Sequence, residues 1–335
     1  MDKHNHIINK KMEAIMYQTI IKPYFFYLAF SFVQVLMTMG QCQAQTLEDL
    51  AKNPALFLQV ATKSQAWNEP AEPARVVGNI YSVGTRGLTA WLITSPQGHI
   101  LVNTGMPASG QLIETAIRKL GFKPEDIKYL LTCHAHIDHV GGHAYLQKLS
   151  GAKVVLMAAE KELIESGGKT DYFYINQPSF LYEPVKVDWA ITDGAVVQLD
   201  SIAIKALHTP GHGQGSTTWI TEVVENGKRY QVVFPDGSGI NPGFHVTAPE
   251  SYKGMGDNYR QTLQKLEMLK PDIWLTSHAA SMKFEEKLKR AATEGVIAWV
   301  DPAGYRLYIA SEREKFDAEV KLEKGIKPVA PAPQQ

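Results

Sequence analysis

Three histidines and an aspartate follow directly on a short apolar run, and this cluster constrains the fold more than any other feature. The run is 127–131, and the cluster reads His134-Ala135-His136-Ile137-Asp138-His139. Side chains alternate along an extended chain, so His134 and His136 point to one side and can bind one ion. The chain then turns, and Asp138 and His139 can face a second ion nearby. Imidazole and carboxylate suit zinc, so the sequence predicts a two-metal hydrolytic site at the end of a buried strand.

Two histidines far from the cluster are candidates to complete the ligand set. His212 lies in a Pro-Gly-His-Gly turn between predicted strands, and His278 follows the strand predicted at 272–276. A lone histidine in such a setting is more often structural, but here the cluster needs further ligands. A plain surface cluster of histidines is the alternative. The regular spacing at a strand end, followed by Gly141-Gly142, argues against it.

Apolar periodicity indicates a chain in which strands and helices alternate. We predict strands at 75–83, 89–95, 99–103, 127–131, 152–157, 198–206, 216–222, 229–234 and 272–276. We predict helices at 47–56, 111–120, 144–149, 252–269 and 305–322, and a long loop at 166–188. Such alternation indicates an α/β fold. Two strand-rich halves with helices outside favour a four-layer αββα sandwich.

The N-terminus has the pattern of a secretory signal peptide over residues 1–44. Lysines precede an uncharged apolar stretch at 24–37, and small residues precede Gln45. We therefore expect export to the periplasm, a folded domain at 45–325, a disordered Pro/Ala-rich tail at 326–335 and no stable membrane association after cleavage. A retained anchor is less favoured, because the apolar stretch is shorter than the roughly 20 residues of a spanning helix. A lipoprotein at Cys42 is weaker still.

Charge and cysteine content narrow the classes of partner. The chain has 34 basic and 34 acidic residues, and removal of residues 1–44 leaves 30 and 32, a net charge of −2. This balance gives no reason to expect nucleic-acid binding. Cys133 is then the only cysteine, so we expect no internal disulfide.

The order His-x-His-x-Asp-His and then Pro-Gly-His resembles the metallo-β-lactamase superfamily, whose fold is an αββα sandwich. A narrower resemblance, to subclass B3 β-lactamases, spans residues 67–320. It is carried by the segments 78–89, 92–101, 208–219 and 300–310, of which the last is the most specific.

The resemblance implies roles for individual residues and a reaction. His134, His136 and His212 would bind one Zn²⁺, and Asp138, His139 and His278 a second. Asp138 would also orient a hydroxide that bridges the ions and attacks the β-lactam carbonyl. The substrates would be penicillins, cephalosporins and carbapenems, and the activity would confer antibiotic resistance, in a monomer. Ser238, Asn241 and Tyr174 are the candidate substrate contacts.

Two departures from the superfamily pattern leave alternatives open. Asn103 stands where an aspartate of the outer metal shell is usual, so metal affinity is expected to be lower. Asp236 is ambiguous, since an aspartate in this region bridges both metals in lactonases and glyoxalase II-like hydrolases but not in B3 enzymes. A lactonase or thioesterase of the same fold is the first alternative. A non-catalytic zinc-binding protein is the second.

Overall fold

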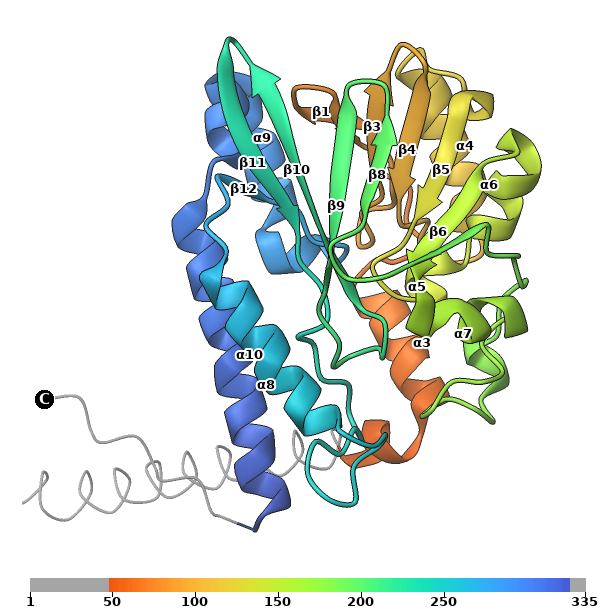
Figure 1. Cartoon of the computed structure of the whole chain (residues 1–335), viewed down its shortest axis with the longest axis vertical. Helices are drawn as coiled ribbons and strands as arrows, with labels where there is room; N and C mark the ends of the chain where they lie inside the picture. Colours follow the sequence, from red (N-terminus) through yellow and green to blue (C-terminus); the bar gives the residue numbers. More distant parts are fainter. Residues whose placement is uncertain (1–47, 326–335) are drawn as a thin grey trace, which may run out of the picture. The chain divides into compact units, whose positions relative to one another are not determined.

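Two β-sheets face each other, and helices cover the outer face of each, as Figure 1 shows. The computed structural model describes residues 48–325. The unit that contains both sheets begins at Asn53. The signal peptide predicted at 1–44 and the tail predicted at 326–335 lie outside the described residues. The α/β fold and the four-layer αββα arrangement predicted from the sequence are confirmed.

The first sheet contains seven strands whose spatial order follows their order in the chain. They are β1 (Ala74–Val77), β2 (Ile80–Ser82), β3 (Trp91–Ser95), β4 (Gly98–Val102), β5 (Ile127–Leu131), β6 (Lys153–Met157) and β7 (Trp189–Ile191). Strands β1 to β4 pair antiparallel, and β4 to β7 pair parallel. Parallel neighbours require crossover connections, and α4 (Ser109–Lys119) and α6 (His143–Ser150) supply two of them on the outer face.

The second sheet has the order β12-β11-β10-β9-β8. Its strands are β8 (Val196–Leu199), β9 (Ile202–His208), β10 (Thr217–Glu225), β11 (Lys228–Phe234) and β12 (Ile273–Trp274). All pairs are antiparallel except β11 with β12. Helices α8 (Met255–Met268), α9 (Phe284–Glu294) and α10 (Pro302–Glu323) lie on the outer side of this sheet in Figure 1.

Between Asn53 and residue 325, three further α-helices and five short 3-10 segments connect these layers. The helices are α3 (Pro54–Ser64), α5 (Ile137–Val140) and α7 (Lys161–Ser166). The 3-10 segments are η2 (Pro124–Asp126), η3 (Ala158–Glu160), η4 (Pro178–Phe180), η5 (Ala279–Met282) and η6 (Gly295–Trp299).

The hydrophobic core is divided between two layers, which explains why strands of the first sheet are apolar on both faces. All five residues of β4 are buried. Leu101 belongs to the cluster shared with Ile113 of α4, whereas Ile100 belongs to the cluster shared with Trp219 of the second sheet. Alternate residues of one strand therefore pack in opposite directions, as the pleat of a strand requires.

Several predicted elements differ from the structure at sites where the backbone turns. The strand predicted at 75–83 is two strands, because the chain turns at Gly78 with a φ of +52°. The strand predicted at 198–206 is also two, separated at Asp200 with a φ of +50°. The helix predicted at 47–56 is interrupted at Asn53, whose side chain caps α3 by accepting the N–H of Leu56. Helix α9 was not predicted.

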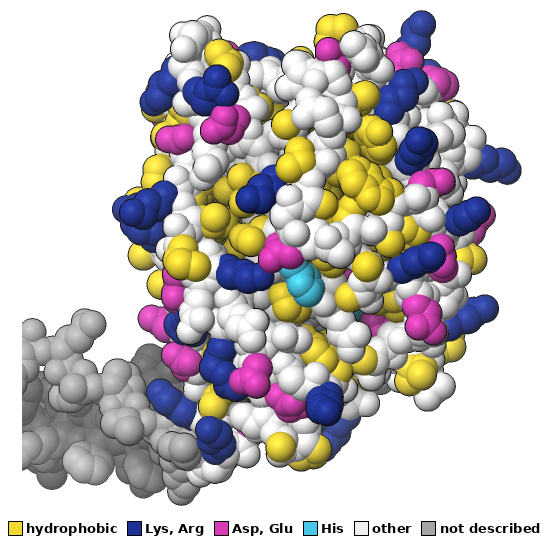
Figure 2. Space-filling view, viewed as in Figure 1, with side chains coloured by type: hydrophobic (Ala, Val, Ile, Leu, Met, Phe, Trp, Pro, Cys, Tyr) yellow, Lys and Arg dark blue, Asp and Glu magenta, His cyan; other side chains and the backbone are white. Residues whose placement is uncertain are grey.

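The surface of the described residues carries charges of both signs. Figure 2 shows basic and acidic side chains interspersed over the face in view, without a continuous patch of one sign. Among the helices of residues 48–325, none combines the length and the apolar character needed to cross a bilayer.

Candidate metal centre

The histidine cluster lies directly after β5, where the chain passes into the short helix α5. His134 and His136 precede the helix, and Asp138 and His139 lie within it. Close packing explains the glycine at position 141, because a Cβ there would lie 2.4 Å from the backbone nitrogen of Pro107. This turn brings all four candidate ligands to the same edge of the sheet.

His212 comes from the turn between β9 and β10 and is held by backbone contacts. Its N–H donates to the carbonyl oxygen of Gly237 at 3.1 Å, and the hydroxyl of Tyr172 donates to its carbonyl at 2.7 Å. Gly237 has a φ of +92°, and a Cβ there would lie 1.8 Å from the carbonyl oxygen of Thr209. The turn and the 236–239 loop can approach this closely only with glycine at position 237.

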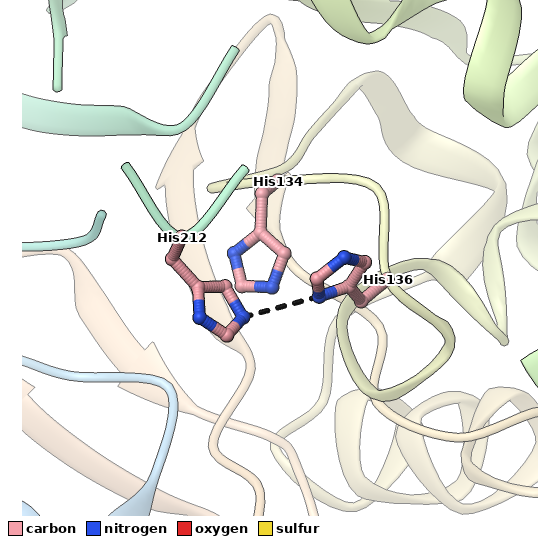
Figure 3. Close-up of side chains that lie close together, drawn as sticks. All are labelled: His134, His136 and His212. Atoms are coloured by element: carbon pink, nitrogen blue, oxygen red, sulfur yellow. Dashed lines mark hydrogen bonds between the residues drawn. The ribbon is translucent and has the colours of Figure 1, made fainter. Parts of the chain in front are cut away.

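The imidazoles of His134, His136 and His212 converge, as Figure 3 shows. Nδ1 of His136 lies 3.1 Å from Nε2 of His212, and Nε2 of His134 is buried without a hydrogen-bond partner among residues 48–325. One nitrogen from each ring falls within 4.8 Å of the others. Two nitrogens bound to one tetrahedral zinc at 2.0–2.1 Å are about 3.3 Å apart. The spacing and the unpartnered nitrogen therefore fit a shared metal ion.

A second group of candidate ligands surrounds the carboxylate of Asp138. Its Oδ2 lies 3.5 Å from Nε2 of His139 and 3.5 Å from Nε2 of His278. Nε2 of His139 is also buried without a hydrogen-bond partner from any residue that the structure describes, and His134 lies close enough to border both groups. The structure thus brings together all six residues that the sequence suggested as metal ligands.

Two acids contact the outer sides of these imidazoles: Asp236, whose role the sequence left ambiguous, and the buried Asp171, which the sequence did not mark. Oδ2 of Asp236 lies 2.9 Å from Nδ1 of His134, and Oδ2 of Asp171 lies 3.2 Å from Nε2 of His136. The carbonyl of Gly239 accepts from Nδ1 of His212 at 2.9 Å. Such acceptors fix the ring orientation and leave the other nitrogen free to bind a metal. Asp236 therefore contacts a candidate ligand and is outside both candidate ligand groups.

Glu160 connects the two segments that carry histidines. Its buried carboxylate accepts the N–H of Ala135 at 3.0 Å and the N–H of Gly215 at 2.6 Å. Burial raises the pKa of Glu160. No local sequence signal marks Glu160 or Asp171, because each meets its partner only through the tertiary fold. A buried acid next to a histidine turn is recognisable only once the fold is known.

The pKa values of the candidate histidine ligands are consistent with metal binding. Burial lowers the pKa of His134 and of His139 well below the ordinary value, and lowers the pKa of His212 to about 4. These rings are neutral, with lone pairs available for a metal. Burial also lowers the pKa of His136, but the carboxylate of Asp171 outweighs it and raises that pKa to about 9. Asp171 thus favours positive charge at His136, and a bound cation supplies such charge.

Asn103, at the end of β4, joins the cluster to the segment that carries His278. Its Oδ1 accepts the N–H of Cys133 at 2.9 Å and lies 3.4 Å from Nδ1 of His139. Its Nδ2 donates to the hydroxyl of Ser277 at 2.7 Å. The residue has a φ of +63°, which asparagine tolerates better than most residues. A neutral amide therefore occupies the outer side of His139.

The candidate ligands open onto a cavity of about 340 Å³. Ser238, Asn241 and Tyr174, the predicted substrate contacts, all line it. The hydroxyl of Tyr174 accepts from Nδ2 of Asn241 at 2.9 Å. The ring of Tyr174 stacks on that of Phe180, with the ring centroids 3.8 Å apart. Tyr174 and Ser238 are almost fully buried, whereas Asn241 is partly exposed. The other lining side chains include Phe57, Leu58, Trp67, Ile240, Tyr308, Glu312 and Lys315.

Comparison with known proteins identifies the family. The family model described as metallo-β-lactamase superfamily matches residues 83–222. The native FEZ-1 metallo-β-lactamase of Legionella gormanii is 36% identical, with a TM-score of 0.75 over 76% of this chain and 98% of its own. BJP-1, a subclass B3 metallo-β-lactamase of Bradyrhizobium japonicum, is 32% identical, with a TM-score of 0.74 over 79% of this chain and 98% of its own.

The fold and the histidine site define a metal-binding hydrolase. The chain belongs to the metallo-β-lactamase superfamily, and its solved structural neighbours include subclass B3 enzymes. Curated relatives have a different activity: an N-acyl homoserine lactonase of Bacillus cereus is 26% identical over 163 residues, 41% of this chain. The chain spans 59% of the length of that lactonase.

Proposed function

We propose that the chain is a zinc-dependent β-lactamase of subclass B3 that hydrolyses penicillins, cephalosporins and carbapenems. The observation that carries the proposal is the extent of the likeness to β-lactamases. The match to FEZ-1 covers 98% of that enzyme at 36% identity, whereas the match to the lactonase covers 59% at 26%. The position of Asp236 adds support, because it contacts His134 from outside and does not join the ligand atoms.

The donor set supports two zinc ions per chain. His134, His136 and His212 would hold one ion, and Asp138, His139 and His278 the other. These are nitrogen and carboxylate donors, which zinc accepts in catalytic sites. When bound, the ions supply Lewis acidity for the carbonyl group and activation of water.

The protein groups position the reactants. Asp138 carries its Oδ2 between His139 and His278, where it can orient an attacking water and hold its proton. Asp171 and Asp236 fix the rings of His136 and His134. The wall of Tyr174, Asn241 and Phe180 borders the place where a small cyclic amide would lie. No protein nucleophile is required in this scheme.

We also propose that the chain acts as a periplasmic monomer and confers antibiotic resistance. The support is the signal-peptide pattern of residues 1–44 and a small-molecule cavity. Electrophoretic comparison of periplasmic and cytoplasmic fractions, with N-terminal sequencing, tests the export. A mature chain that retains residues 1–44 would contradict it.

Lactone hydrolysis is the second candidate function. It is favoured by the curated relatives, several of which are N-acyl homoserine lactonases. A lactone and a β-lactam are both cyclic carbonyl compounds, and either can be opened by water that a binuclear site activates.

The experiment that tests the proposal compares kcat/KM of the zinc-loaded chain on three substrates. These are a chromogenic cephalosporin, a carbapenem and an N-acyl homoserine lactone. We expect the β-lactams to be preferred, and a preference for the lactone would contradict the proposal. His245→Ala serves as a control, since His245 is exposed and outside the cavity. Two bound zinc ions without turnover of any of the three substrates would leave a thioesterase or a non-catalytic zinc protein as the alternatives.

A further inference from the structure

One wall of the cavity comes from α10, the long helix that runs beside α8 in Figure 1. Tyr308, Glu312 and Lys315 of this helix line the cavity together with the candidate metal ligands. Their spacing of four and three residues places them on one face of the helix. The cavity therefore has a metal-binding side and a helical side that carries charge.

Lys315 is the only lysine or arginine among the described residues that line this cavity. Its ammonium donates to Oε1 of Glu312 at 2.7 Å, and Glu312 is almost fully buried. The side chain of Lys315 is 64% exposed. An ammonium has three donors, so the contact with Glu312 leaves two for a ligand.

Apart from the histidines, the other charged side chains that line the cavity within residues 48–325 are acids. Asp138 and Asp236 lie against histidines, and Glu312 is paired with Lys315. A carboxylate that entered the cavity would thus find one protein cation outside the metal centre. Penicillins, cephalosporins and carbapenems carry a carboxylate next to the lactam nitrogen, whereas N-acyl homoserine lactones are neutral.

We propose that Lys315 is a specificity-determining residue whose ammonium binds the carboxylate of an anionic substrate. The inference rests on the proposed function and narrows it to substrates with a free carboxylate. Glu312 anchors the ammonium at the cavity wall and competes for it. The two residues therefore have opposite effects: Lys315 attracts an anionic substrate, and Glu312 weakens that attraction.

The test uses the zinc-loaded chain with a cephalosporin as the free acid and as its methyl ester. Lys315→Met is expected to raise KM for the free acid about tenfold, the scale of a lost charge-assisted hydrogen bond, with little change in kcat. KM for the ester stays unchanged. Lys315→Arg retains most of the preference for the acid, and Glu312→Gln lowers KM for it. Lys321→Met is the matched control, since Lys321 lies on α10 but does not line the cavity.

Equal effects of Lys315→Met on the acid and the ester, or no effect on either, would overturn the inference. Binding separates this failure from failure of the proposed function. If the wild-type chain does not turn over the cephalosporin, the ratio of Kd for acid and ester is measured by isothermal titration calorimetry. A ratio that Lys315→Met shifts about tenfold sustains the role of Lys315. An unshifted ratio, or no binding of either compound, overturns it.

Discussion

Oδ2 of Asp236 lies 2.9 Å from Nδ1 of His134, on the opposite side of the ring from the nitrogen that faces the cluster. Nε2 of His134 is consequently on the side of His136 and His212, and it has no hydrogen-bond partner within the described part of the chain. The contact explains how an aspartate next to the candidate metal centre can act through a candidate ligand without joining the ligand set.

The first prediction concerns this contact. Asp236→Ala removes the acceptor that orients His134, so we expect zinc affinity to fall by about 10- to 100-fold. Asp236→Asn keeps an oxygen acceptor and is expected to lose less. Competition with a chromophoric chelator measures both. Unchanged affinity in Asp236→Ala would show that the ring is fixed by packing alone.

Asn103→Asp is expected to tighten the metal site. It places a negative charge 3.4 Å from Nδ1 of His139, which makes that imidazole a stronger donor. We expect Kd for the second zinc to fall about tenfold, on the scale of outer-shell effects. Isothermal titration measures the change, and Asn103→Ala, which lacks the oxygen, is expected to move Kd in the other direction. A weaker site in Asn103→Asp would contradict the role of Asn103.

Removal of metal is expected to destabilise the fold. Buried imidazole nitrogens of His134 and His139 lose their partner when the ion leaves. Zinc at a hundredfold excess over Kd adds about 2.7 kcal/mol to the free energy of unfolding. We therefore expect chelation to lower Tm by several degrees, and zinc to restore it, in differential scanning calorimetry. Equal Tm values with and without chelator would exclude a metal bound tightly at this site.

His136→Ala and Asp138→Ala are each expected to abolish turnover and leave the fold largely intact. Each removes a candidate ligand, so we expect kcat to fall at least about a hundredfold, the loss seen when one stabilising group is removed. Circular dichroism checks the fold, and a steady-state assay the rate. A rate near that of the wild type in either variant would refute the site assignment.

The convergence of the clustered histidines and Asp138 was predictable because their spacing is local. His134, His136, Asp138 and His139 lie in one short segment after an apolar strand, where period and turn decide which way side chains point. His212 and His278 were candidates only because the cluster needed further ligands, and the family resemblance then gave each a role, since only the tertiary fold brings them to the cluster. Asp171 was missed for the same reason: its contact with His136 spans 35 residues and leaves no periodic signal.

The fold was predictable at the level of layers and less so at the level of boundaries. Alternating apolar segments gave the two sheets, but the turns at Gly78 and Asp200 fall inside stretches that remain strand-like in composition. Helix α9 was not predicted because few of its residues are buried, so few apolar residues mark a helical period in its sequence. The loop predicted at 166–188 begins at the last residue of α7 and contains η4. Its backbone is otherwise irregular.

The most direct test of the central claim is hydrolysis of a chromogenic cephalosporin by the purified chain, measured before chelation, after chelation and after zinc is restored. The account predicts turnover that the chelator stops and zinc recovers, with loss of the same activity in His136→Ala. No turnover by a chain that holds two zinc ions would contradict it, and lactones and thioesters would then be the substrates to examine.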